Sequence, residues 1–345
     1  MRNGVVFFNL KKNKKISKQL KKLKIQNKKN IIGDLIKNNK MITTSIFIVL
    51  LVVTVYSVDN LAEKNVYDEL LEENKLEYRG EVSKNGLKEY KIDLNNINVY
   101  NTNTYQKITL GDIKITNYSS SRNLDFNHIL KSKIELDKNK DKILIYHTHA
   151  SESYSNSDKY KFEYSGTYRS KDEKYNMLHI GEVLGDNLNK YQIKYTQDRT
   201  THDYSSYLNS YIRSAQTIKS NVQKEKYRLI MDVHRDAFGD LTKGVRVNLN
   251  GKTYAQLMFV VGMGTSGYYN PYALENLSFV LNLMALANTN YPGLFRPMLL
   301  RSSKYNQDLN KYAILLECGT TGNKIEEVEN SMEIFAKLLN EFYKK

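Results

Sequence analysis

The sequence predicts an α/β fold in which helices flank a mostly parallel sheet, preceded by one transmembrane helix and a small accessory region. Three observations lead to this prediction. A basic N-terminal arm is followed by an uncharged apolar run, strand and helix patterns alternate from about residue 139, and polar side chains follow three of the predicted strands. Strands that alternate with helices in this way are typical of parallel sheets.

The positive charge of the chain is concentrated at its N-terminus. Of the net charge of +15, residues 1–40 carry +12, because Arg2 and twelve lysines face the single acid Asp34. Residues 41–58 contain no charged side chain and reach the lower limit of length for a helix that spans a bilayer. We interpret this run as an uncleaved signal anchor, because the basic arm is long and no A-x-A-like cleavage site follows. The lysines predict a cytoplasmic N-terminus and an extracytoplasmic remainder.

The composition excludes several classes of protein. A single cysteine, Cys318, excludes an intramolecular disulfide framework and a four-cysteine zinc site. Because it ends an apolar run, we expect it to be a small buried hydrophobic residue. The lysines of the basic arm are not interleaved with aromatic residues or arginines, so no specific nucleic-acid recognition is expected. Contact with anionic lipid is the role that the arm favours.

Two regions follow the predicted anchor. Residues 59–138 are predicted to form a stalk or small accessory region, because charged and polar runs alternate there with short strand-like segments at 89–94 and 113–116. Residues 139–345 are predicted to form the catalytic domain. Its predicted strands lie at 142–146, 192–195, 227–233 and 312–316, its helices at 175–188, 205–222, 274–287 and 324–343, and a hairpin at 244–262.

Three of the predicted strands end in side chains that bind metals or transfer protons. His147, His149 and Glu152 follow the first strand, His234 follows the third, and Glu317 ends the last. Such sheets form their sites beyond the carboxyl ends of the strands. Two histidines and a carboxylate with one open position form the ligand set of a catalytic zinc site, and a second carboxylate acts as general base and acid. We expect His149, Glu152 and His234 to bind the metal, with His147 as the alternative first ligand and Glu317 as the acid/base.

Two further residues are candidates for supporting roles. Asp236 lies two residues after His234. It is a candidate to accept a hydrogen bond from the ring N–H of a metal-bound histidine, on the side of the ring that faces away from the metal. An ordinary local salt bridge is the alternative for Asp236. His202 lies in the loop after the second predicted strand, where it is a candidate to contact a substrate in the cleft.

Three segments of the chain resemble one known family. They are YHTHASES at 146–153, HRDA at 234–237, and YPGLFRPMLLRSSKYNQDLNKYAILLECGTTGN at 291–323. In these motifs the chain resembles the stage II sporulation protein P family, the membrane-anchored peptidoglycan hydrolases of endospore-forming bacteria. The resemblance covers roughly residues 139–345, and the basic arm and single predicted span fit the topology of the family.

The resemblance implies a zinc-dependent N-acetylmuramoyl-L-alanine amidase, similar in fold to other amidases of this class and to carboxypeptidase A-like enzymes. His149, Glu152 and His234 match its metal-binding positions, and Glu317 matches its catalytic acid/base. The commoner amidases take their metal-binding Glu from the start of the following helix. There this chain offers the alternatives Asp172 and Glu173.

The resemblance also implies a biological setting. It implies cleavage of peptide cross-links as a further activity, and joint action with the lytic transglycosylase stage II sporulation protein D during forespore engulfment. The protein is then expected in the septal membrane between forespore and mother cell. Arg301, Tyr305 and Asn306 are candidates for holding the stem peptide of the substrate.

Two other functions are compatible with the same residues. A metallo-carboxypeptidase or endopeptidase that acts on stem peptides uses the same combination of ligands and carboxylate. A non-catalytic wall-binding scaffold that retains the site as a vestige is the other alternative, and the complete set of three ligands and one further Glu argues against it.

Overall fold

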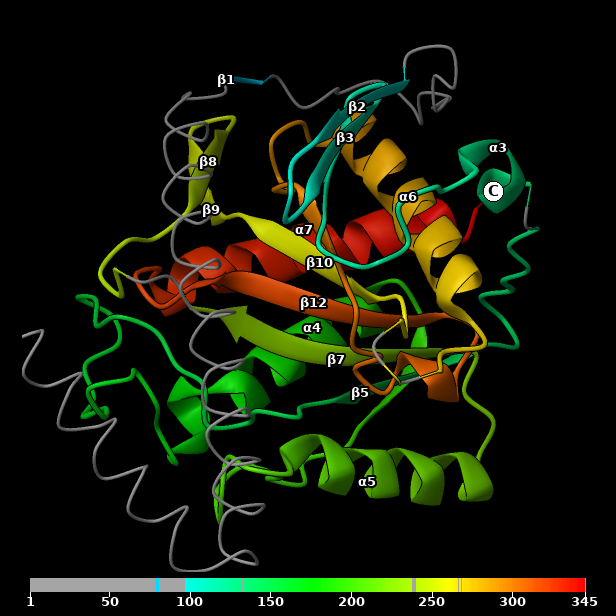
Figure 1. Cartoon of the computed structure of the whole chain (residues 1–345). Helices are drawn as coiled ribbons and strands as arrows, with labels where there is room; N and C mark the ends of the chain where they lie inside the picture. Colours follow the sequence, from blue (N-terminus) through cyan, green and yellow to red (C-terminus); the bar gives the residue numbers. More distant parts are fainter. Residues whose placement is uncertain are drawn as a thin grey trace, which may run out of the picture. The chain divides into compact units, whose positions relative to one another are not determined.

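The computed structural model describes residues 79–80, 97–131, 133–237, 240–265, 267 and 269–344 (Figure 1). The chain divides into two compact units, Met1–Asp68 and Glu69–Lys345, and the described residues all belong to the second. The predicted basic arm and the predicted anchor at 41–58 therefore lie outside the described residues. Within the described part of the chain, no helix has both the length and the apolar character that a bilayer crossing requires.

Nine strands of the described residues form one sheet, in the order β2-β3-β4-β11-β10-β12-β7-β5-β6. Their bounds are β2 (Ile97–Asn101), β3 (Gln106–Leu110), β4 (Ile113–Asn117), β5 (Lys142–Tyr146), β6 (Lys194–Gln197), β7 (Leu229–Asp236), β10 (Leu257–Gly262), β11 (Met298–Arg301) and β12 (Ala313–Thr320). β12, β7, β5 and β6 are parallel, as are β10, β11 and β4. These two parallel blocks meet at the antiparallel pair β10–β12. The α/β class is confirmed, and the sheet is mostly parallel as predicted, with antiparallel pairs at β10–β12, β2–β3 and β3–β4.

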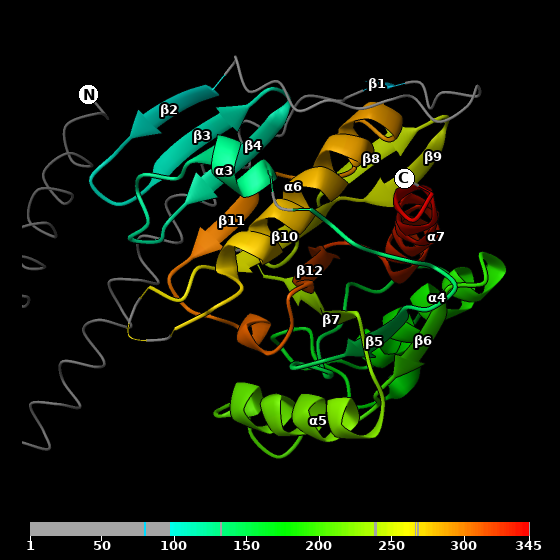
Figure 2. The same ribbon diagram turned by 90° about the vertical axis from the view of Figure 1, so that its right-hand side faces the viewer.

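Part of the predicted accessory region belongs to this sheet. Residues 97–117 form β2, β3 and β4, and Figure 2 shows these strands continuing the sheet past β11. β4 pairs in parallel with β11, and alternate residues of β3 and β4, such as Ile108 and Ile115, join the main core. Because these apolar side chains are buried against the rest of the fold, the boundary predicted at residue 139 is not a boundary of the sheet.

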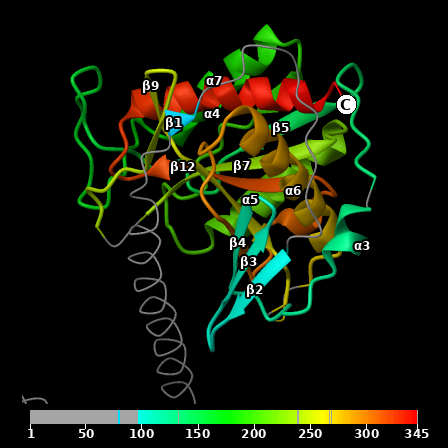
Figure 3. The same cartoon turned by 90° about the horizontal axis from the view of Figure 1, so that it is seen from above.

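Helices cover both faces of the sheet. One face packs against α4 (Met177–Lys190), α6 (Ala273–Asn290) and α7 (Ile325–Phe342), and Figure 3 shows α7 lying beside α4. The opposite face packs against α5 (Ser210–Lys224), whose Ile218 contacts the cluster around Leu144 and Ile230. The short helix α3 (Phe126–Leu130) precedes β5. All four predicted helices are confirmed, although α5 begins five residues later than predicted because Asn209 has a left-handed φ of 64°.

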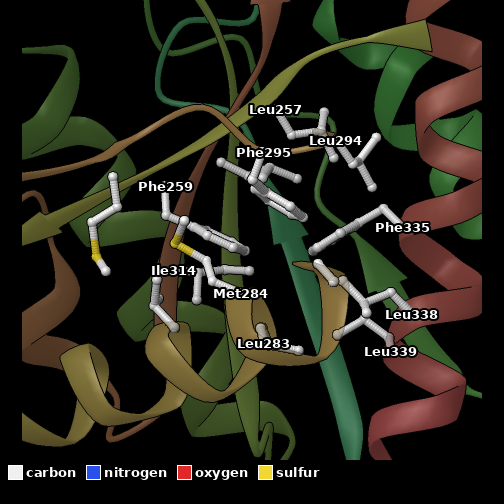
Figure 4. Packing of buried hydrophobic residues seen from close by; sticks show 14 of the residues in the cluster. Leu257, Phe259, Leu283, Met284, Leu294, Phe295, Ile314, Phe335, Leu338 and Leu339 are labelled. Carbon is white, nitrogen blue, oxygen red and sulfur yellow. The ribbon is translucent and has the colours of Figure 1, made fainter. Parts of the chain in front are cut away.

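The main core lies between the sheet and the pair α6 and α7. Figure 4 shows Phe259 of β10 against Phe295 and Phe335. The ring centroids of Phe259 and Phe295 are 4.7 Å apart and the rings are stacked. Those of Phe259 and Phe335 are 6.2 Å apart. Buried aromatic rings contribute the largest apolar areas to a core, so this cluster fixes α7 against the sheet.

The predicted hairpin is present, although its second half is shorter than predicted. β8 (Arg246–Leu249) and β9 (Lys252–Ala255) are antiparallel and are joined by Asn250 and Gly251, with φ values of 52° and 80°. Two positive φ angles are the requirement of the tight hairpin turns that favour Asn-Gly. Residues 257–262 leave the hairpin and enter the main sheet as β10, while β1 (Arg79–Gly80) pairs with β8.

A close approach between α4 and β5 leads to a prediction on stability. A Cβ at Gly181 would lie 2.5 Å from Nε2 of His147 and would also meet the amide of Gln197. We expect Gly181→Ala to lower the free energy of unfolding by about 1–3 kcal/mol, because the added Cβ would displace the fully buried ring of His147 and the half-buried amide of Gln197. This loss is expected despite the better helix propensity of Ala. Chemical denaturation measures it.

Gly166→Ala is the matched control, because a Cβ at Gly166 meets no atom within 4 Å. We expect this control to unfold within about 0.5 kcal/mol of the wild-type chain. Equal stability of the two variants would contradict the close packing of α4 on His147.

Candidate active site

The site forms where β5, β7 and β12 end. Side chains alternate along a strand, so Ile230, Asp232 and His234 of β7 point to the face that α5 covers. His234 pairs in register with Glu317 on the parallel neighbour β12. Since residues in register on parallel strands point to the same face, both side chains stand at one edge of the sheet. The loop after β5 brings His149 to the same place.

The side chain of His234 contacts both the carboxylate of Glu152 and the ring of His149. Oε2 of Glu152 is 3.6 Å from Nδ1 of His234 and accepts a hydrogen bond of 3.0 Å from the backbone N–H of Arg235. The rings of His149 and His234 meet edge to face, with centroids 5.2 Å apart. His149, Glu152 and His234 are 5%, 6% and 3% exposed. The structure therefore brings together the three residues that the sequence predicts as ligands.

Asp232 supports His234 from behind. Its Oδ1 lies 2.9 Å from Nε2 of His234, although the angle does not allow a hydrogen bond of good geometry. Asp232 also accepts hydrogen bonds from the backbone N–H and the hydroxyl of Thr148, at 2.8 and 2.6 Å. Burial lowers the pKa of His234, but the charges of Asp232 and Glu152 outweigh burial and hold this pKa well above its usual value.

Of the two roles that the sequence leaves open for Asp236, the structure shows the salt bridge and not the support of His234. Oδ2 of Asp236 instead accepts a hydrogen bond of 3.0 Å from the guanidinium of Arg296, and both side chains are buried. The reason is the place at which the strand ends. Asp232 lies within β7 beside His234, whereas Asp236 is its last residue and reaches toward the segment before β11.

Glu317 has the properties of a proton-transfer group. Its Oε2 is buried and has no hydrogen-bond partner. Burial and, after it, the negative charge of Asp236 raise the pKa of Glu317 to about 8, although His234 has the opposite effect. A carboxyl group with a pKa near neutrality can both accept and release a proton under physiological conditions.

His147 lies inside the fold and not at the site. Its Nδ1 is 3.0 Å from the carbonyl oxygen of Val233, and its Nε2 is 3.1 Å from the side-chain amide of Gln197. The side chain is fully buried, and burial lowers the pKa of His147 to about 4. Both ring nitrogens are thus engaged within the protein. Of the two histidines that the sequence leaves as alternatives, His149 is the one beside His234.

The helix-start carboxylates are also engaged elsewhere. Asp172 caps a 3-10 turn by accepting the backbone N–H of Lys174, and Glu173 pairs with Arg199 at 2.6 Å. Glu152, in contrast, is in contact with His234. The geometry therefore favours Glu152 over both alternatives as the carboxylate of the site.

Sequence reasoning missed the residues that cover His149. Tyr207 stacks on the His149 ring with centroids 4.2 Å apart, and Tyr211 meets the same ring edge to face at 5.6 Å. The guanidinium of Arg169 lies 4.8 Å from the Tyr207 ring centre and 3.5 Å from Oε1 of Glu152. These residues are distant in the sequence and carry no motif, so only the fold brings them together.

The predicted substrate-binding residues occupy different environments. His202 is buried, with Nδ1 2.8 Å from the carbonyl oxygen of His147 and Nε2 2.9 Å from the hydroxyl of Thr217, so both its ring nitrogens bind within the fold. Asn306 is buried and donates to the carbonyl oxygen of Tyr211. Both side chains therefore hold the residues around the site in place, and their described hydrogen bonds are made within the protein.

Tyr305 and Arg301 remain partly exposed. The ring of Tyr305 lies 5.6 Å from that of Tyr211, which places it next to the aromatic residues around His149. The guanidinium of Arg301 lies 4.7 Å from the ring centre of Tyr118, toward the β4 side of the sheet. Tyr305 is the candidate substrate residue that the fold brings nearest to the site through a described contact.

The residues present fit a zinc ion by their chemistry. Among the described residues, no group of three or more His, Cys, Asp or Glu side chains is arranged to hold a metal ion. However, two imidazoles and a carboxylate are the donors that zinc prefers, and His149, Glu152 and His234 meet in one buried place. A metal-binding histidine usually has a carboxylate beside the ring nitrogen that does not bind the metal. Asp232 occupies that position beside the buried Nε2 of His234.

Comparison with known proteins identifies a family. A family model described as stage II sporulation protein P matches residues 37–340. The stage II sporulation protein P of Bacillus subtilis (strain 168) is 31% identical over 215 residues, which cover 58% of this chain and 51% of that protein. The chain thus spans about half the length of this curated relative.

Solved structures with some likeness include two amidases. The N-acetylmuramoyl-L-alanine amidase of Clostridium difficile 630 is 15% identical with a TM-score of 0.34, over 58% of this chain and 92% of that chain. The amidase AmiC2 of Nostoc punctiforme is 13% identical with a TM-score of 0.35, over 59% and 98%.

The different positions of the two histidines lead to a prediction. We expect His147→Ala to lower the free energy of unfolding by about 2–4 kcal/mol, because the buried Val233 and the half-buried Gln197 each lose a hydrogen bond and a cavity remains. We expect His149→Ala to be less destabilising but to abolish stoichiometric zinc binding. Denaturation and elemental analysis of both variants measure these effects.

The exposed His128 provides the control, since His128→Ala is expected to change neither stability nor zinc content. Loss of zinc from the folded His147→Ala variant, with zinc retained by His149→Ala, would reverse the assignment of the two histidines.

Proposed function

The chain belongs to the stage II sporulation protein P family, and from this premise we propose that it is a zinc-dependent peptidoglycan hydrolase. We propose that it cleaves the amide between N-acetylmuramic acid and the L-Ala of the stem peptide. One observation carries this proposal: His149, Glu152 and His234 meet at the strand ends, and the unpaired carboxyl group of Glu317 stands beside them.

The proposed mechanism assigns three residues to metal binding and further residues to their support. His149, Glu152 and His234 would hold the zinc ion, which when bound lowers the pKa of a water molecule and polarises a carbonyl group. Asp232 orients His234 and stabilises its ring by charge. Burial raises the pKa of Glu152, but the hydrogen bond with His234 and the positive charge of Arg235 outweigh burial and hold this pKa well below its usual value, so that the buried carboxylate stays ionised.

Glu317 is proposed as the proton-transfer group. It accepts a proton from the water that attacks the amide carbonyl and gives that proton to the amine that leaves. Its pKa of about 8 before substrate binds suits both steps, because the group exchanges protons readily near neutral pH. Tyr305 and the rings of Tyr207 and Tyr211 border the place where a substrate would lie, and they are proposed to exclude water from it.

Incubation of the full chain with purified peptidoglycan tests the activity. We expect peptide-free glycan strands among the products, no product after chelation, and recovery when zinc is restored. Glu317→Gln is expected to lower the rate by about 10²–10⁴-fold, the usual contribution of a general acid/base, while zinc stays bound. Mass spectrometry of the released fragments and elemental analysis give these readouts.

Glu333→Gln is the matched control, because Glu333 is exposed and pairs only with Lys252 in the described contacts. It is expected to retain full activity. If the products are cut only within the stem peptide, the activity is that of an endopeptidase or carboxypeptidase and not of an amidase. Product formation that continues after chelation would refute the zinc mechanism.

We also propose that the catalytic unit lies outside the cytoplasm, held by the predicted anchor at residues 41–58. The +12 charge of residues 1–40 favours this orientation. In protoplasts, external protease is expected to remove a C-terminal tag and to leave an N-terminal tag intact; the opposite result would reverse the orientation. Joint action with stage II sporulation protein D and the septal location stay predictions from the family.

A further inference from the structure

We propose that the segment between β5 and α4 carries a binding site for the sugar chain of peptidoglycan, next to the site that cleaves the amide. This inference rests on the proposed function, because it assigns the glycan part of the same substrate. Two observations support it: a row of aromatic rings and an open cavity that two of these rings line. Figure 1 shows the green loops of this part of the chain beyond the arrowhead of β7.

The aromatic row consists of five rings, from Tyr160, Phe162, Tyr164, Tyr168 and Tyr175. Phe162 and Tyr175 are stacked with centroids 4.5 Å apart, and so are Tyr164 and Tyr168. Phe162 and Tyr164 join the two pairs edge to face at 5.5 Å. None of the five rings is fully buried, and Tyr164 is 36% exposed. The row is therefore continuous and reaches the surface.

A cavity of about 460 Å³ opens along this row. Phe162 and Tyr175 supply apolar walls, while Ser170 and two pairs of opposite charge supply polar groups. The charged residues of the lining are Lys161, Glu163, Lys171 and Asp172. This volume lies in the range of small-ligand sites, and so does the combination of aromatic walls with a few polar groups.

The chemistry of the lining favours a neutral sugar. A pyranose ring presents an apolar face of C–H groups, which packs on a flat aromatic ring, and hydroxyl groups around its edge, which need both donors and acceptors. Lys161 and Lys171 are balanced by Glu163 and Asp172, so the lining does not favour a polyanion. N-acetylated hexosamines, the repeating units of the glycan strand, meet these requirements.

The segment is anchored to the rest of the fold at several points. The backbone N–H of Ser155 donates to the carbonyl oxygen of Asn323 at 3.1 Å, and the hydroxyl of Ser157 donates to Glu326 at 2.9 Å. The ammonium group of Lys159 donates to Glu329 at 2.8 Å. Because α7 and the residues before it hold the segment, the rings are positioned before a ligand arrives, and less entropy is lost on binding.

The far end of the row reaches the wall of the candidate active site. The carbonyl oxygen of Tyr168 accepts hydrogen bonds from the backbone N–H of Ser153 at 2.9 Å and from the guanidinium of Arg235 at 3.2 Å. The next residue, Arg169, reaches Glu152. A glycan strand on the rings would thus run toward the residues proposed to cleave the peptide from it.

Binding of a peptide-free tetrasaccharide of N-acetylglucosamine to the full chain in detergent tests the proposal. This probe lacks the amide bond, so its binding does not depend on hydrolysis. We expect saturable binding that chelation does not change. Phe162→Leu keeps an apolar side chain but removes the flat ring. We expect this variant to raise the Kd by roughly three- to tenfold.

Three further variants complete the test. Phe162→Tyr retains the ring and is expected to bind as the wild type does, as is Tyr100→Leu, which removes an exposed ring on β2. Tyr164→Leu removes an exposed ring of the row, is expected to weaken binding, and serves if Phe162→Leu does not fold. Unchanged affinity in the Phe162 or Tyr164 leucine variants, or no binding of the probe to the wild type, would overturn the proposal.

The same probe separates this proposal from the proposed function. If the chain binds the tetrasaccharide through Phe162 but releases no peptide from peptidoglycan, the result supports the sugar site and contradicts the proposed amidase activity. A chain that cleaves peptidoglycan without binding the tetrasaccharide keeps the amidase assignment and loses the sugar site.

Discussion

The buried carboxylate of Asp232 is the group on which the arrangement of the site depends. It is fully buried between the apolar neighbours Met231 and Val233 of β7, where an ionised carboxylate is costly unless polar partners surround it. Thr148 supplies two of these partners from the end of β5, and the imidazole of His234 supplies the third. Meeting this requirement joins the ends of β5 and β7, and hence His149 and His234, in one geometry.

This network continues into the helix that covers the site. The hydroxyl of Thr148 lies 2.8 Å from that of Ser214 on α5, and Ser214 accepts a hydrogen bond of 3.0 Å from Asn306. The large core lies on the other face of the sheet, between the strands and α4, α6 and α7. Stability and chemistry are thus separated by the sheet: one face is packed with apolar side chains, and the other carries buried polar groups at the strand ends.

Much of this fold is predictable from the sequence, because buried parallel strands and amphipathic helices have strong local patterns. The bounds of β5 were predicted without error, and the strand-end positions of His234 and Glu317 follow from the apolar runs before them. Strand direction was not predictable, since the apolar run of β10 has the same pattern in an antiparallel pair as in a parallel one. β11 was missed because its four residues form too short a run.

The partners in the site were harder to predict than its main residues. An Asp among the apolar residues that begin β7 is a signal in itself, because charged residues are rarely buried without a role; this signal does not enter the sequence-based prediction, which names Asp236 in place of Asp232. Arg169 and Tyr207 had no such signal. The choice between His147 and His149 depended on which ring meets Gln197 and Val233 inside the fold, and that is a matter of tertiary packing.

The pairing of β1 with β8 makes Arg79 and Gly80 part of the same folded unit as the other described residues. Because Arg79 and Gly80 are already part of the folded unit, only residues 59–78 separate it from the predicted anchor. A fully extended chain of this length spans at most about 70 Å. In the topology proposed above, a hydrolase anchored at residues 41–58 would reach only the wall that lies within about this distance of its membrane.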